Sequence, residues 1–299
     1  MDKVFRAKTT IEQWRILHAL VEHGSYASAS EVLNKSQSSL NHAVAKLQSQ
    51  LGIALLEVDG RKTKLTNAGS AMLRRSKKIL HDIQSLEEFA DTLNNGWEAE
   101  IIIACEILYP KHRLLKVLQD YWPQSRGSRL KITDEVISGS TEAIRNRTAH
   151  IVLTPNAPEG VHGNHLCTAR LVPVCHPSHS ILEYDSISSD ELADHLQIVI
   201  SDTGQEKPDN GWLKAEKRWT VTNFYEAITI LQQGLGFCWV PMHYIEQHIQ
   251  DGSLVIFNFE GSTEKQVPVS LVIPDRKNAG PGVLLLEQLI LAEHQADRE

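Results

Sequence analysis

The chain has 299 residues, of which 41% are hydrophobic and 22% charged, so we expect a soluble globular protein of two or three domains. It has no uninterrupted apolar stretch of about 18 residues and no signal-peptide core in its first residues, which excludes membrane and secreted classes and predicts a cytoplasmic protein without a membrane partner. The net charge of −7 is uneven: residues 1–78 hold 13 Lys and Arg against 6 Asp and Glu, and the remaining residues hold 17 against 31, a distribution typical of a basic nucleic-acid-binding end.

Two helices are predicted first. Apolar residues recur at helical spacing after the N-cap candidates Thr9 and Thr10, and the run ends at Gly24. Ser25 can cap a short second helix that ends at Leu33, and residues 34–35 then make a turn.

A third helix is predicted from Ser36, with Leu40, Val44, Leu47 and Leu51 as its core stripe. Its other face carries amide, hydroxyl and imidazole groups, which match base edges in a major groove, and lysine, which pairs with phosphate. The pattern predicts a helix-turn-helix, although an amphipathic helix with an ordinary hydrated face gives the same pattern. The predicted DNA-binding residues on this helix are Ser36, Gln37, Ser38, Ser39, Asn41, His42 and Lys46.

A hairpin is predicted next, because residues 55–66 alternate apolar and polar on either side of Asp59-Gly60. It carries Arg61, Lys62 and Lys64, which we expect to contact phosphates along the DNA backbone. A basic hairpin after a helix-turn-helix indicates a winged helix-turn-helix.

A long helix without Pro or Gly is predicted over residues 70–93. Along this helix a set of mostly apolar residues recurs at alternating spacings of four and three, which gives a seam of period 3.5. Such a seam indicates a partner helix in a homodimer. The alternative is that the seam packs against the rest of the same chain. The seam residues are Met72, Ser76, Ile79, Ile83, Leu86, Ala90 and Leu93.

From Glu98 onward, apolar strands alternate with helical runs, which predicts an α/β fold with mainly parallel sheets in two units. The expected strands are 100–105, 129–136, 150–155, 171–176, 197–201 and 267–274, and the expected helices are 110–121, 140–147, 188–195, 224–233, 242–250 and a C-terminal run.

The stretch "WRILHALVEHGSYASASEVLNKSQSSLNHAVAKLQSQLGIALLEVDGRKTKLTNAG" resembles the N-terminal signature of the LysR-type transcriptional regulators. The matching positions are Gly24-Ser25, Ser36-Gln37, Leu40, Leu47, Leu51-Gly52, Leu65-Thr66 and Ala68-Gly69, and departures lie at Ser38, Asn41, His42, Leu56 and Val58. A second, less specific resemblance to the family's effector domains lies in "NFYEAITILQQGLGFCWVPMHYIEQHIQDGSLV".

The resemblance implies a one-component regulator without catalytic activity or a cofactor. It implies a winged helix-turn-helix in residues 1–66, a linker and dimerisation helix in 67–96, and an effector-binding domain in 97–299. That domain has two Rossmann-like, periplasmic-binding-protein-like subdomains, about 97–170 with 267–299, and about 171–266. The implied partners are double-stranded DNA, a small-molecule effector, further copies of the chain in a homodimer and homotetramer, and RNA polymerase. An effector bound between the subdomains would favour one of their relative arrangements. This change would reorient the paired DNA-binding heads and so alter the bend or spacing that they impose on DNA.

Ligands in such folds bind outside the carboxyl ends of strands, at the subdomain interface. The predicted effector-binding residues are Glu106, Ile107, Leu108, Ile137, Ser138, Ser201, Asp202 and Thr203. Many LysR-type proteins have a small hydroxyl residue where this chain has Glu106, and there it binds an effector carboxylate together with backbone N–H groups. A carboxylate at this position predicts a neutral or cationic, aromatic effector, with outward pairing of Glu106 to Lys111 or Arg113 as the alternative.

Two other function classes have some support in the sequence. The four cysteines form no CxxC pair, and GxSxG, HExxH and Walker-type motifs are absent, which disfavours disulfide scaffolds and the familiar enzymes. A solute-binding or catalytic α/β protein remains an alternative. A metal-responsive regulator is another, with zinc or copper bound by His162, His165, Cys167, Cys175, His176 and His179, although this spacing fits no familiar motif and we predict no metal site.

Overall fold

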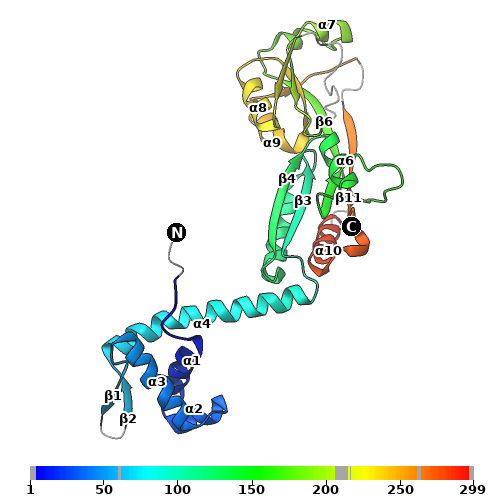
Figure 1. Ribbon diagram of the computed structural model, residues 1–299. Coiled ribbons are helices and arrows are strands. Elements are labelled where there is room, and N and C mark those ends of the chain that lie inside the picture. The colour runs from blue at the N-terminus through cyan, green and yellow to red at the C-terminus, as the bar shows by residue number, and fades with distance from the viewer. Residues whose placement is uncertain (1–4, 60–61, 206–214, 216, 261–263, 296–299) are drawn as a thin grey trace. The chain divides into compact units, whose positions relative to one another are not determined.

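A computed structural model describes residues 5–59, 62–205, 215, 217–260 and 264–295 (Figure 1). The chain divides into two compact units, Met1–Thr92 and Leu93–Glu299.

The first unit begins with three helices whose ends are fixed by local side chains. Thr10 caps the first helix in a capping box with Gln13, and Gly24 ends it in the left-handed conformation, with φ of +72°. The hydroxyls of Ser25 and Ser36 accept N–H bonds at the starts of the second and third helices. These caps confirm the predicted helix starts. The helices are α1 (Ile11–His23), α2 (Tyr26–Leu33) and α3 (Gln37–Leu51).

A short antiparallel hairpin, β1 (Leu56–Asp59) with β2 (Lys62–Leu65), follows α3 and precedes the long helix α4 (Asn67–Asn94). Helix α4 begins three residues before the predicted start. A Cβ at Gly69 would lie 2.0 Å from the carbonyl oxygen of Leu55, so only glycine allows the first turn of α4 to lie against the segment that leads into the hairpin. Leu55 is itself fully buried with the core of the three helices.

The described part of the second unit contains one mixed nine-stranded sheet, ordered β4-β3-β5-β11-β6-β9-β7-β8, with β10 paired to β6. Strands β3, β4 and β5 run parallel, as do β7, β8 and β9. The strands are β3 (Glu100–Glu106), β4 (Arg129–Glu135), β5 (Ile151–Thr154), β6 (Asn164–Cys175), β7 (Gln197–Ile200), β8 (Arg218–Val221), β9 (Phe237–Pro241), β10 (Val255–Ile256) and β11 (Lys265–Val272).

Strands β6 and β11 differ from the prediction of mainly parallel sheets, because both run antiparallel to their neighbours and to each other. One end of β11 pairs with β5 and one end of β6 pairs with β9, so the two strands form a continuous ribbon between the two parallel groups. The pairing of β6 with β11 changes register at a bulge between Val269 and Ser270.

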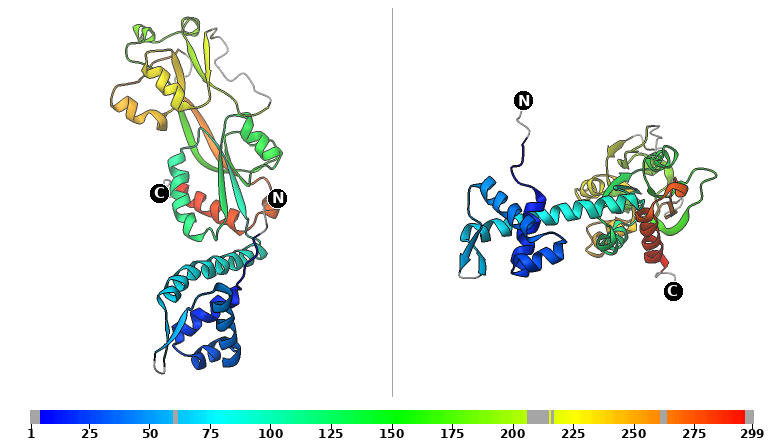
Figure 2. Two further views of the ribbon diagram at one scale, coloured as in Figure 1. Left: turned by 60° about the vertical axis from the view of Figure 1, so that its left-hand side comes forward. Right: turned by 60° about the horizontal axis from the view of Figure 1, so that its bottom comes forward.

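Two lobes are thereby defined in the second unit (Figures 1 and 2). Lobe I holds β3–β5 with α5 (Lys111–Tyr121), α6 (Ser138–Arg145) and α10 (Pro281–Gln295). Lobe II holds β7–β10 with α7 (Ser189–Ala193), α8 (Phe224–Gln232) and α9 (Met242–Gln250). The predicted strands and helices were found, and β8, β9, β10 and the first half of β6 were missed.

Candidate functional sites

Helix α3 presents a polar face opposite a buried stripe. Leu40, Val44 and Leu47 are buried in the core of the first unit. The seven predicted DNA-binding residues of this helix, Ser36, Gln37, Ser38, Ser39, Asn41, His42 and Lys46, are all exposed. The amphipathic arrangement is as predicted, and contact with DNA stays a prediction.

The hairpin of β1 and β2 follows this helix in the sequence. Its register pairs Glu57 with Lys64 and Asp59 with Lys62, and Lys64 is exposed. Arg61 lies outside the described residues, and only the backbone of Lys62 is described. Phosphate contact by these three cations therefore stays a prediction.

The predicted seam of α4 divides into two parts. Its first part packs within the first unit: Met72 lies against the helical core, and the buried Ser76 hydroxyl lies 2.9 Å from Nε2 of His18. Its second part leaves apolar side chains exposed, with 53% of Ile79 and 66% of Leu86 accessible and Ile83 half-buried between them. Exposed leucine and isoleucine at this spacing are typical of a helix that packs against a partner.

Glu106 ends β3 in a buried position, with 1% of the residue exposed. Its carboxylate accepts N–H bonds from Leu108 at 2.8 Å and Ile137 at 3.5 Å. The alternative of an outward ion pair is wrong, because Lys111 pairs with Asp134, and a guanidinium nitrogen of Arg113 lies 2.9 Å from Nδ1 of His294. Burial raises the pKa of Glu106 to about 7, although the two N–H bonds act in the opposite direction.

Replacing Glu106 by Gln is expected to raise stability at pH 8 by about 1–3 kcal/mol. The folded-state pKa of about 7 lies above the ordinary value of 4.5, so the contribution of this group to stability is full below pH 4.5 and is lost as pH rises through about 7. Denaturant unfolding at pH 5 and pH 8 measures the effect, with the exposed Glu183→Gln as control. An equal difference from the unsubstituted protein at both pH values would contradict a buried, proton-binding Glu106.

The loops after β4 and β7 contact each other across the two lobes. The Asp202 carboxylate accepts the N–H of Ser138 at 3.0 Å and also its hydroxyl. The Thr203 hydroxyl donates to the Glu135 carboxylate at 2.9 Å and accepts the N–H of Val136 at 2.9 Å. We call this set of contacts the interlobe clasp.

Ile137 lies between the clasp and Glu106 with φ of +48°, a conformation that β-branched residues rarely adopt. Its neighbours hold it there, because its own N–H bonds to Glu106 and the next residue bonds to Asp202. Strain of this kind is concentrated at functional sites.

The structure thus brings the predicted loops of both lobes together. Ile107 and Leu108 are buried, and the Tyr244 hydroxyl donates to the carbonyl of Ile107 at 3.1 Å. Ser201 makes its side-chain bond to the neighbouring Asp202 carbonyl instead of to lobe I. Sequence reasoning missed two residues of this region, Tyr244 and Gly204. The N–H of Gly204 donates to the Asp202 carboxylate at 2.6 Å, and the Asp-x-Gly turn at 202–204 was the signal that could have identified it.

The six residues of the metal alternative are not assembled. His165 and Cys167 lie near the start of β6, and Cys175 ends it, about 27 Å away from Cys167 at the usual rise per strand residue. Burial raises the pKa of Cys175 to about 12, and His176 bonds to Ser178 at 2.7 Å. Among the described residues there is no group of three or more His, Cys, Asp or Glu side chains placed to hold a metal ion.

Comparisons with known proteins agree with this architecture. Residues 94–295 match the family model of the LysR substrate binding domain, and residues 11–70 match that of the bacterial regulatory helix-turn-helix proteins of the lysR family. The chain is 28% identical over 262 residues to the HTH-type transcriptional regulator YhaJ of Escherichia coli, covering 85% of this chain and 88% of YhaJ. It is 23% identical to PunR, another Escherichia coli regulator, over 82% of this chain and 81% of PunR.

The fold is similar to that of solved regulators of this family. Full-length LysG from Corynebacterium glutamicum, a LysR-type regulator, matches with a TM-score of 0.52 and 15% identity, over 96% of this chain and 98% of that one. In the described part of this chain, no helix combines the length and apolar character needed to cross a membrane.

Proposed function

The chain belongs to the LysR-type transcriptional regulators, which bind DNA and carry an effector-binding domain, and we propose that it reads its operator with α3 and senses a neutral or cationic aromatic compound between its two lobes. In this proposal residues 1–66 bind DNA, residues 67–96 join two copies, and residues 97–299 sense the effector. Subdomain I comprises about 97–170 with 267–299, and subdomain II about 171–266. Such a regulator acts in the cytoplasm on double-stranded DNA.

The buried carboxylate of Glu106 is the observation that carries the effector class. Its oxygens accept the backbone N–H groups of Leu108 and Ile137, which are donors of the kind that would otherwise bind an effector carboxylate. An anionic effector would therefore find these donors already occupied, and above the Glu106 pKa of about 7 it would also meet a like charge. A phenol or an amine could donate to Glu106, and the apolar side chains of Ile107 and Leu108 suit a ring beside it.

The interlobe clasp suggests how binding would alter the protein. Ser138, Asp202 and Thr203 bond to residues of the opposite lobe or its loops, so an effector that competes for them favours a different arrangement of the lobes. We propose that this shift is transmitted through a homodimer formed by α4, and that dimers pair into a tetramer that contacts RNA polymerase on the DNA. The exposed second part of the α4 seam supports the dimer.

The effector class is tested by titrating the purified protein with phenols, aromatic amines and the matching aromatic carboxylates, with heat release as the readout. We expect at least one of the first two classes to bind, and Glu106→Gln to weaken that binding by about tenfold, as loss of a charged hydrogen-bond acceptor predicts. Glu183→Gln, an exposed substitution, is the control. Absence of binding by every phenol and aromatic amine, or binding of one of them that Glu106→Gln leaves unchanged, would contradict the proposed effector class.

A further inference from the structure

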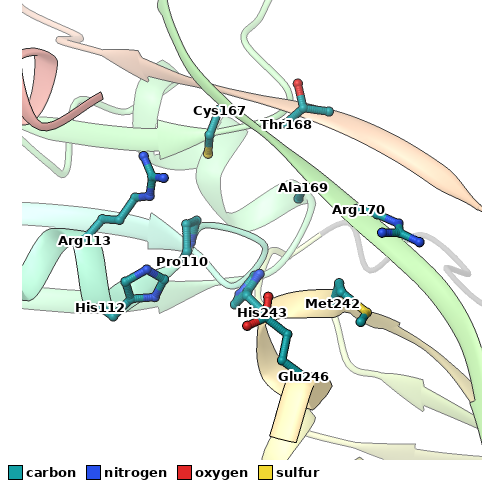
Figure 3. A pocket seen from close by; sticks show the side chains of 10 residues that line it. All are labelled: Pro110, His112, Arg113, Cys167, Thr168, Ala169, Arg170, Met242, His243 and Glu246. Atoms are coloured by element: carbon teal, nitrogen blue, oxygen red, sulfur yellow. The ribbon is translucent and has the colours of Figure 1, made fainter. Parts of the chain in front are cut away.

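A pocket of about 560 Å³ lies between α5, β6 and α9 (Figure 3). Its lining combines the start of α5 in lobe I, the middle of the ribbon strand β6, and the start of α9 in lobe II. None of the predicted effector-binding residues lines it. The lining residues are Pro110, His112, Arg113, Cys167, Thr168, Ala169, Arg170, Met242, His243 and Glu246.

His243 contributes a buried polar atom to the wall of this pocket. Its Nε2 atom is buried and has no hydrogen-bond partner among the described residues. Buried polar atoms are nearly always paired in native proteins, so an atom of this kind on a pocket wall indicates a partner that the chain itself does not supply. Burial, with a further contribution from His112, lowers the pKa of His243 to about 4, so the ring is neutral near pH 7 and can donate a proton from Nε2.

The charges around the pocket favour an anion. Arg113 and Arg170 contribute guanidinium groups, and Arg170 also pairs with Glu264 at 2.9 Å, whereas Glu246 is the single carboxylate of the lining. Helices α5 and α9 both begin here after a proline and without a side-chain cap, which adds positive partial charge from their first N–H groups.

The remaining surface is suited to the body of a small organic molecule. Pro110, Ala169 and Met242 supply apolar atoms on three sides, from three different elements. The volume lies within the range of small-molecule sites in proteins. The ligand would touch both lobes and the strand that joins them.

We propose that this pocket is a second small-molecule site, for a small organic anion whose acid group hydrogen-bonds His243 and whose apolar part lies against Met242. The inference is independent of the effector proposed for the interlobe loops, and it assigns the two sites ligands of different charge. A ligand here bridges α5 and α9, so it changes the preferred arrangement of the lobes in addition to any effector at Glu106.

The test uses the full-length protein with ¹⁵N-labelled histidine and 4-fluorophenylacetate as the probe anion. The imidazole signals of His243 are assigned by their loss in His243→Leu or His243→Gln. We expect a saturable shift of the His243 signals in the unsubstituted protein, unaltered by Glu106→Gln. The His243→Leu variant, followed through the ¹⁹F signal of the probe, should bind about tenfold more weakly.

His248→Leu is the matched control, because His248 lies on the same helix and bonds to Gln232 and Ser253 instead of lining the pocket. It should keep the affinity for the probe. Absence of any shift at His243, or equal weakening by His248→Leu, would overturn the site. Equal binding of 4-fluorophenethyl alcohol, which lacks the carboxylate, would overturn its preference for anions. Neither outcome bears on the Glu106 site, because that site is tested with Glu106→Gln and with phenols and aromatic amines.

Discussion

Replacing Ile83 and Leu86 of α4 by Asp is expected to dissociate the protein into monomers and to weaken operator binding by about 100-fold or more. Leu86 is 66% exposed and Ile79 one turn before Ile83 is 53% exposed, so this stretch of helix presents apolar area that only a partner would bury. Two like charges on each copy would then face each other across a two-fold axis. A monomer carries one DNA-binding head and contacts only a half-site, which removes the gain from simultaneous binding.

Sedimentation velocity measures the assembly and fluorescence anisotropy measures binding to a labelled operator. The matched control places the same number of charges on the other face of α4, with His81→Asp and Gln84→Asp, both at exposed positions. The control should remain dimeric. A seam variant that stays dimeric at the concentrations of the binding assay would show that the dimer forms through other residues.

Gln37→Ala is expected to cost about 1–3 kcal/mol at the true operator and little on random DNA. Gln37 is the first residue of α3, it is exposed, and its amide can bond in a bidentate manner to adenine in the major groove. Helix α3 is held by its buried stripe, so the substitution leaves the rest of the first unit in place.

Lys64→Ala is the comparison variant, because lysine on the hairpin is expected to contact phosphate. It should weaken binding to operator and random DNA alike and reduce the slope of log affinity against log salt by about one. Anisotropy titrations at several salt concentrations separate the two behaviours. An equal loss on both DNAs for Gln37→Ala would remove this residue from base recognition.

Local signals were sufficient to predict the first unit. Thr10, Ser25 and Ser36 each precede an apolar run, and each proved to be an N-cap, because capping depends on groups within three residues of one another. Strand β9 was missed because Phe237–Pro241 follows a turn directly and enters α9 without a break, so no alternation or punctuation marks it. The first half of β6 was missed because its polar residues are placed in a sheet only by pairing with β11, about one hundred residues away.

In the candidate effector site, too, features set by local sequence could be predicted and features set by distant contacts could not. Its three loops could be predicted, since the carboxyl ends of parallel strands lie at one edge of a sheet. The burial of Glu106 and the positive φ of Ile137 could not, because both depend on contacts between loops that are distant in sequence. The pocket beside His243 could not be predicted for the same reason, as α5 and α9 are separated by more than one hundred residues.

The ribbon of β6 and β11 determines what kind of motion the lobes can make. Linkers of irregular chain would allow the lobes to swing apart freely, whereas two strands joined by hydrogen bonds along their length resist stretching and shear. The easiest deformation of such a ribbon is torsion about its own axis, and the bulge at Val269 and Ser270 is the place where its ladder is already interrupted. We therefore expect the ribbon to twist most easily at this bulge. A ligand bound beside β6 would then rotate one lobe relative to the other by changing the twist of the ribbon, and would not open the lobes about a hinge.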